Sequence, residues 1–175
     1  MNDNAIAIFG SGRIKAESPD YKRAERLGYL LAKRGFTICN GGYGGIMKAA
    51  SKGANQAGGQ VVAVTCSAFE STTPNHYFTR QINTKSLDER LDTLIRIARA
   101  YIVCAGGTGT LLELAKVWEL KNKGFLNQDK PVILMGDFWK PLMSLISGND
   151  PASSRYVESI DNPEQVLDVL VEYFG

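Results

Sequence analysis

Histidine and cysteine are scarce in this 175-residue chain, and neither is arranged to bind a metal. The one histidine, His76, argues against a histidine-based metal centre. The three cysteines, Cys39, Cys66 and Cys104, lie far apart and form no C-x-x-C pair. Because an odd number of scattered cysteines argues against a disulfide framework or a zinc site, we interpret them as packing residues. The sequence therefore predicts no metal site and a reducing, cytoplasmic setting.

An excess of charge of one sign is also lacking, as are long hydrophobic runs. Lys and Arg number 20 against 18 Asp and Glu, which leaves a formal net charge of +2. So small a balance gives no electrostatic basis for binding nucleic acid or an anionic membrane. No apolar run approaches the roughly 18 residues of a transmembrane helix, and the amino terminus lacks the cationic flank of a signal peptide. We therefore expect no nucleic-acid partner and no membrane association.

Short apolar runs alternate with longer amphipathic ones along the chain. Strands are expected at 5–9, 36–39, 61–64, 101–104 and 131–135, with a short one at 156–157. Helices are expected at 19–33, from 46, at 87–98, 111–121 and 138–146, and from 163, where Asn162 is the predicted N-cap. The polar stretch from Cys66 to Thr84 is predicted to be a long functional loop. This alternation predicts an α/β fold, a single doubly wound Rossmann-like domain over residues 1–175, with a parallel sheet covered by helices on both faces.

Glycines gather where three of these expected strands end. The turns hold Gly10 and Gly12; Gly41, Gly42, Gly44 and Gly45; and Gly106, Gly107 and Gly109. A glycine turn that opens a helix presents free N–H groups at the positive end of the helix dipole, which suits a phosphate. A tight turn also needs glycine for its geometry alone, so one such turn is weak evidence. Three of them at one edge of a doubly wound sheet predict an anion or nucleotide site.

The familiar nucleotide-binding motifs do not match. The pattern GxxxxGK[ST] is absent, which argues against a P-loop ATPase. None of the turns completes GxGxxG, because Lys15, Met47 and Leu112 stand where the last glycine belongs. A classical dinucleotide oxidoreductase is therefore disfavoured.

Two candidate reactive residues, Arg90 and Glu113, both have simpler interpretations. The run from Thr110 to Glu113 fits a capping box, in which the glutamate reaches back to the N–H group of the cap residue. Arg90 on its own fits a solvated helix position or an ion pair with Asp88 or Glu89. Local sequence favours these structural roles over catalysis for each residue taken alone.

Taken together, the motifs resemble those of the Lonely-guy (LOG) family of cytokinin riboside 5′-monophosphate phosphoribohydrolases. The family signature PGGxGTxxE appears at 105–113 and GGGxxGxMG at 40–48, with Phe9-Gly10-Ser11 and Leu87-x-x-Arg90 in the same order and spacing. The chain departs from the family pattern at Ala105, Asn40, Lys48, Leu91 and Leu112. Related sequences often carry the label of lysine decarboxylase, but no lysine here is singled out for a Schiff base.

The resemblance implies a homodimer that hydrolyses the N-glycosidic bond of a nucleoside 5′-monophosphate, of cytokinin riboside or AMP type. The products would be the free base and ribose 5-phosphate, with no metal or organic cofactor. Arg90 and Glu113 would be the catalytic pair, the carboxylate stabilising the oxocarbenium-like ribose. The 5′-phosphate would lie on the third turn, and the other two would line the ribose and base. The substrate-binding residues carried over in this way are Gly10, Ser11, Gly42, Gly44, Gly45, Met47, Gly106, Gly107, Thr108, Gly109 and Thr110.

Two other functions stay open. The alternative is a non-catalytic nucleotide or molybdenum-cofactor carrier, since carriers of that cofactor share a similar glycine-rich fold. The departures at Asn40, Lys48 and Leu91 fit such a binder. An interaction module with a vestigial site is the third reading.

Overall fold

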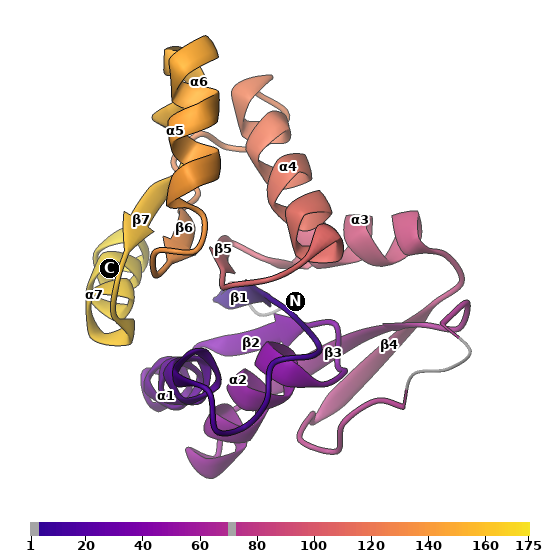
Figure 1. The fold of residues 1–175 in the computed structure, drawn as a ribbon. Coiled ribbons are helices and arrows are strands. Elements are labelled where there is room, and N and C mark those ends of the chain that lie inside the picture. The colour runs from indigo at the N-terminus through magenta and orange to yellow at the C-terminus, as the bar shows by residue number, and fades with distance from the viewer. Residues whose placement is uncertain (1–3, 70–72) are drawn as a thin grey trace.

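In the computed structural model, which describes residues 4–69 and 73–175, the sheet has seven parallel strands in the order β4-β3-β2-β1-β5-β6-β7 (Figure 1). The strands are β1 (Ala5–Phe9), β2 (Thr37–Asn40), β3 (Val61–Cys66), β4 (Arg80–Thr84), β5 (Ala100–Val103), β6 (Val132–Met135) and β7 (Glu158–Ile160). The helices are α1 (Pro19–Lys33), α2 (Gly45–Gln56), α3 (Leu87–Ile97), α4 (Thr108–Asn122), α5 (Lys140–Asn149), α6 (Pro151–Ser154) and α7 (Pro163–Phe174).

A hydrophobic core lies on each face of the sheet, because the central strands are apolar on both sides. In β1, Ile6 and Ile8 pack with α1, α2 and α7, whereas Ala7 and Phe9 pack with α3 and α4. Successive side chains of a strand point to opposite faces, so a fully buried strand is an uninterrupted apolar run. Figure 1 shows α1 and α2 on one side of β1, and α3 and α4 on the other. The predicted doubly wound α/β fold is confirmed.

The strand order reverses at β1, which is paired with β2 on one side and β5 on the other. The chain builds outward from β1 to β4 and then returns to build β5, β6 and β7. The loops that follow β1 and β5 therefore part in opposite directions, and ligands of such folds bind in the crevice between them. The first and third glycine turns follow these two strands.

Several predicted elements differ from the observed ones. The stretch from Cys66 to Thr84 is not irregular throughout, because its last residues form β4, an edge strand parallel to β3. The strand is mostly exposed and polar, so no apolar run marks it in the sequence. Helix α4 begins at Thr108 rather than Leu111, the last strand lies at 158–160 rather than 156–157, and α6 was not expected.

The cysteines are packing residues in the structure, and its helices are short. All three cysteines lie in the described part of the chain, where they are buried and form no disulfide. Burial raises the pKa of the Cys39 and Cys104 thiols to about 12, which leaves them protonated and unreactive. Over residues 4–69 and 73–175, no helix is long and apolar enough to cross a membrane.

Candidate functional site

The three glycine turns meet at the carboxyl edge of the sheet. The N–H group of Ser11 in the first turn donates to the carbonyl oxygen of Ala105, before the third turn, at 3.0 Å. Ser11 in turn accepts, at 2.9 Å, from the N–H group of Ile46 after the second turn. A Cβ on Gly45, whose φ is +55°, would overlap the Ser11 carbonyl, so this contact requires glycine. The fold thus brings the three turns together around the point where strand order reverses.

The third turn leaves the amino terminus of α4 open. Its N-cap is Gly107, which supplies no side-chain hydrogen bond, and no acidic residue lies in the first helical turn. Gly107, Thr108 and Gly109 are exposed. Within the described residues, the N–H groups of 108–110 donate no hydrogen bond, as expected for the first turn of an uncapped helix. By contrast, serine or asparagine side chains cap α1, α3 and α7. The terminus of α4 is therefore free to receive an anion.

The capping-box interpretation of Glu113 is wrong. Because α4 begins at Thr108, Thr110 lies inside the helix and does not cap it. The Glu113 carboxylate instead pairs with Arg90, with Oε1 3.4 Å from Nη1. Arg90 is therefore neither solvated nor paired with a neighbour on its own helix, as local sequence had suggested. The misreading arose because the extended Gly107 starts the helix one turn earlier than the apolar pattern indicates.

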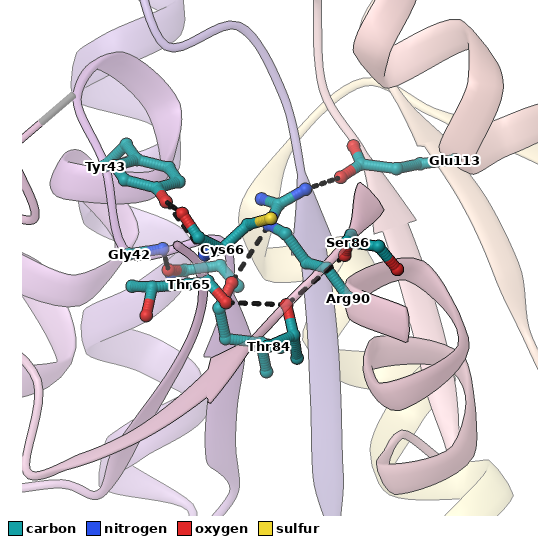
Figure 2. A network of polar contacts seen from close by, with 10 residues as sticks. Gly42, Tyr43, Thr65, Cys66, Thr84, Ser86, Arg90 and Glu113 are labelled. Atoms are coloured by element: carbon teal, nitrogen blue, oxygen red, sulfur yellow. Dashed lines mark hydrogen bonds and ion pairs between the residues drawn. The ribbon is translucent and has the colours of Figure 1, made fainter. Parts of the chain in front are cut away.

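Arg90 is held by contacts with several elements, and Figure 2 shows its guanidinium group between Tyr43 and Glu113. Its side chain is 8% exposed. Its Nε donates to the carbonyl oxygen of Val64 at 2.9 Å, and its Cζ lies 5.8 Å from the ring centre of Tyr43 and 5.7 Å from that of Phe69. A Cβ on Gly41 would overlap Nη2, so glycine makes room for the guanidinium. Arg90 is thus a fixed cation that faces Glu113.

Burial shifts the ionisation of the Glu113 carboxyl toward neutral pH. Its side chain is 12% exposed. Burial raises its pKa from 4.5 to about 7, and the charge of Arg90 and the hydrogen bond from it oppose that rise. A carboxyl group whose pKa lies near the working pH can both accept and release a proton. The pair is therefore suited to acid–base or charge-stabilising chemistry.

The raised pKa of Glu113 predicts how Glu113→Gln changes stability with pH. The folded protein binds more protons at this site than the unfolded chain between pH 4.5 and about 7. Burial of Glu113 therefore lowers the free energy of unfolding as pH rises through that window, by about 3 kcal/mol at about 1.4 kcal/mol per pKa unit. We expect the free energy of unfolding of Glu113→Gln, measured in urea, to rise relative to that of the parent protein between pH 5 and pH 8. A difference that does not change with pH would contradict the raised pKa.

The second turn differs from the third because asparagine side chains bind several of its polar groups. The side chain of Asn40 accepts from the N–H group of Gly42 at 2.8 Å and donates to Met47 and Ser51. Asn75 donates to the carbonyl oxygens of Gly42 and Tyr43. Neither asparagine was among the predicted site residues. Asn40 carried a signal, as a departure from a family glycine, whereas nothing marked Asn75.

The predicted substrate-binding residues are therefore not equally available. Several are open to solvent at the edge of the sheet, wholly or in part: Ser11, Gly44, Met47, Gly106, Gly107, Thr108 and Gly109. Others are buried and shape the turns: Gly10, Gly42, Gly45 and Thr110. The structure brings all of them to one edge, where the third turn combines exposure at residues 107–109 with N–H groups that donate no hydrogen bond.

Comparison with known proteins shows which family the chain resembles. A model of the SLOG cluster4 family matches residues 3–167. An uncharacterized protein of Archaeoglobus fulgidus is 32% identical over 131 residues, 75% of this chain and 83% of that protein. The pyrimidine/purine nucleotide 5′-monophosphate nucleosidase of Escherichia coli K12 is 30% identical over 142 residues, 76% of this chain. The cytokinin riboside 5′-monophosphate phosphoribohydrolase of Mycobacterium marinum is 31% identical over 118 residues, 66% of this chain.

The chain spans only 31% of the length of that nucleosidase and 62% of that phosphoribohydrolase. The resemblance to phosphoribohydrolases is therefore a distant one. Among solved structures, the molybdenum cofactor binding protein of Rippkaea orientalis superposes with a TM-score of 0.81 at 26% identity, covering 100% of this chain and 99% of that one. The molybdenum cofactor carrier protein of Chlamydomonas reinhardtii, at 23% identity and a TM-score of 0.75 over 97% of this chain and 98% of that one, shares the fold.

Proposed function

Because the chain belongs to the SLOG cluster4 family, we propose that it is a hydrolase of nucleoside 5′-monophosphates. It cleaves the N-glycosidic bond to give the free base and ribose 5-phosphate. The observation that carries this proposal is the buried ion pair of Arg90 with Glu113. Glu113 lies about one and a half turns along α4 from the open amino terminus of that helix.

The 5′-phosphate binds at the amino terminus of α4 in this proposal. The free N–H groups of 108–110 and the helix dipole both favour an anion there. The exposed hydroxyl of Thr108 adds a donor. The second turn, whose N–H and carbonyl groups are engaged by Asn40 and Asn75, forms a rigid wall on the ribose and base side. Phosphate binding thus places the ribose between the third turn and the Arg90–Glu113 pair.

Glu113 acts in its ionised form on the ribose. As the bond from C1′ to the base nitrogen breaks, positive charge develops on the ribose, and a nearby carboxylate stabilises it. Water then forms the new C1′–O bond and Glu113 accepts the proton that the water loses, which it returns to solvent before the next turnover. The departing base nitrogen takes up a proton from solvent. Arg90 cannot supply that proton, because its pKa lies above about 12. Its role is to hold the carboxylate in place and to keep part of it ionised.

Relatives and neighbours support two candidate functions. The relatives from Escherichia coli and Mycobacterium marinum are named as enzymes of nucleoside monophosphate cleavage, at 30% and 31% identity. The structure from Rippkaea orientalis favours the second candidate, a carrier of a nucleotide or of molybdenum cofactor, because it matches over nearly the full length of both chains. We favour the hydrolase because a carrier has no need of a buried Arg90–Glu113 ion pair close to the open amino terminus of α4.

Incubation with AMP and with isopentenyladenosine monophosphate, followed by chromatography, tests the hydrolase. We expect free base and ribose 5-phosphate in equal amounts, and the faster substrate identifies the base class. Binding of the nucleotide without release of base would favour the carrier. No thermal shift with any nucleotide at millimolar concentration would contradict both the hydrolase and a nucleotide carrier, since stabilisation follows ligand occupancy. Light scattering of the same preparation tests the homodimer that we propose from the resemblance.

The phosphate site predicts a large difference between two substitutions at Thr108. Proline is well tolerated at the first position of a helix, and the preceding Gly107 is extended, with φ −96° and ψ −154°, outside the α region that a following proline disfavours. Thr108→Pro therefore keeps α4 but removes an N–H group and a hydroxyl from the site. Since a hydrogen bond to a charged group contributes about 1.5–3 kcal/mol, we expect phosphate and AMP to bind at least about 10-fold more weakly.

The control is Thr108→Ala, which removes the hydroxyl and keeps the N–H group. Its loss of affinity in a thermal-shift titration should be clearly smaller than that of Thr108→Pro. Equal affinity of Thr108→Pro and the parent protein, with helix content unchanged by circular dichroism, would place the anion elsewhere.

A further inference from the structure

Asn75, in the connection between β3 and β4, is bound tightly to the second glycine turn. It is 9% exposed. Its side-chain amide donates to the carbonyl oxygens of Gly42 and Tyr43, both at 2.9 Å, and its backbone N–H group donates to Gly42 at 2.7 Å. Its Oδ1 accepts from the N–H group of Tyr77 at 2.9 Å. Aspartate could not replace Asn75 here, because an ionised carboxylate has no N–H group to donate to the two carbonyl oxygens.

The turn that Asn75 holds carries Tyr43, and Tyr43 covers Arg90. The Tyr43 hydroxyl donates to the carbonyl oxygen of Cys66 at 3.3 Å and accepts from its N–H group at 3.0 Å. The Tyr43 ring is therefore fixed at both ends, by Asn75 at its backbone and by Cys66 at its hydroxyl. Figure 2 shows the ring beside the guanidinium of Arg90, which points toward Glu113 on its other side.

We propose that Asn75 is a positioning residue for the Arg90–Glu113 pair. It acts through Tyr43: the amide fixes the backbone of the turn, the ring lies against the guanidinium, and the guanidinium faces the carboxylate. As a catalytic statement the proposal rests on the proposed function, but the physical link between Asn75 and the ionisation of Glu113 stands without it. A merely structural Asn75 would stabilise the loop and leave that ionisation unchanged.

The charged groups around Glu113 predict the direction in which loss of Asn75 changes the pKa of Glu113. Arg90, from α3, is the one charge that lowers the pKa of Glu113 among the described residues. The nearby Asp92 and Lys116, on α3 and α4, form an ion pair with each other. Loosening the turn lets the guanidinium move away from the carboxylate, which then loses its opposite charge. Loss of Asn75 should therefore raise the pKa of Glu113 further.

The test compares Asn75→Ala with Thr79→Val. Thr79 fixes the other end of the same connection, through hydrogen bonds of its hydroxyl with Val61 and Gln60, and contacts no residue of the pair. The first readout is the titration of the Glu113 carboxyl by ¹³C NMR of the ligand-free protein, assigned with Glu113→Gln. We expect Asn75→Ala to raise the titration midpoint by about half a pH unit or more and Thr79→Val to leave it in place.

The second readout is the kinetics with AMP at pH 7. We expect Asn75→Ala to lower kcat by about 10-fold or more while KM changes by less than about threefold, because the phosphate site on α4 is untouched. Asn75→Ser, which keeps one donor, should move both readouts in the same direction by less, and it replaces Asn75→Ala if that variant does not fold. An unchanged Glu113 midpoint in a folded Asn75 variant would overturn the proposal. A parent protein that releases no base would refute the proposed function and leave the NMR result decisive for Asn75.

Discussion

Glu113→Gln is expected to lower kcat on a nucleoside 5′-monophosphate by at least about 100-fold while the protein stays folded. General acid–base catalysis contributes about 10²–10⁴ in rate, and an amide neither carries the charge that stabilises the ribose nor accepts a proton from water. Glutamine has the size of glutamate and offers Arg90 an oxygen acceptor, so the fold and the phosphate site are retained. The measurement is steady-state release of base, with AMP affinity followed in parallel.

The matched control for this substitution is Glu119→Gln on the same helix. Glu119 is exposed and forms a surface ion pair with Lys123 at 3.6 Å, a kind of contact that contributes little to stability. Its substitution should leave kcat within about twofold of the parent. Near-parental turnover by Glu113→Gln would refute the catalytic role of the carboxylate, whatever the outcome for nucleotide binding.

Arg90→Ala is expected to produce the largest loss of stability among single substitutions at the site. It removes the partner of the buried Glu113 and the donor to Val64, and it leaves a cavity between Tyr43 and Phe69. Breaking a buried ion pair by removing one partner costs about 3–5 kcal/mol. For a chain of this length that corresponds to a fall in Tm of about 6–20 °C.

Two further variants test whether the loss of stability in Arg90→Ala comes from its ion pair with Glu113. Arg96→Ala, at an exposed position of the same helix, should change the free energy of unfolding by less than about 0.5 kcal/mol. Adding Glu113→Gln to Arg90→Ala should recover part of the loss, because no buried carboxyl then lacks its cation. Urea unfolding at pH 7 measures all three. A fully additive double variant would show that the two side chains do not interact.

The fold could be predicted from the sequence where one physical signal dominated. The buried run Ala5–Phe9 and the amphipathic run Pro19–Lys33 have the expected bounds, because burial fixed every position of the first and one face of the second. The cap at Asn162 also agrees, as its side chain accepts from the N–H group of Gln165. Edge strand β4 escaped prediction because it has one neighbour and a mostly exposed, polar sequence.

The site could be predicted only in outline. Glycine placement and the spacing of the resemblance indicated that Arg90 and Glu113 belong together, although local sequence favoured a cap and a solvated arginine. The observed start of α4 rules out the capping role for Glu113. That start depends on the extended backbone of Gly107, which helix propensities do not predict. Asn75 could not be found at all, because its role consists of contacts to Gly42 and Tyr43, some thirty residues earlier in the chain.

A crystal structure of Glu113→Gln with AMP tests the central claim most directly, because the inactive variant keeps the nucleotide whole. The account predicts the 5′-phosphate on the N–H groups of 108–110, with C1′ in contact with the side chain at position 113 and the base beyond it, on the side of the second turn. A phosphate bound at another edge of the sheet, or a ribose with C1′ remote from residue 113, would contradict it.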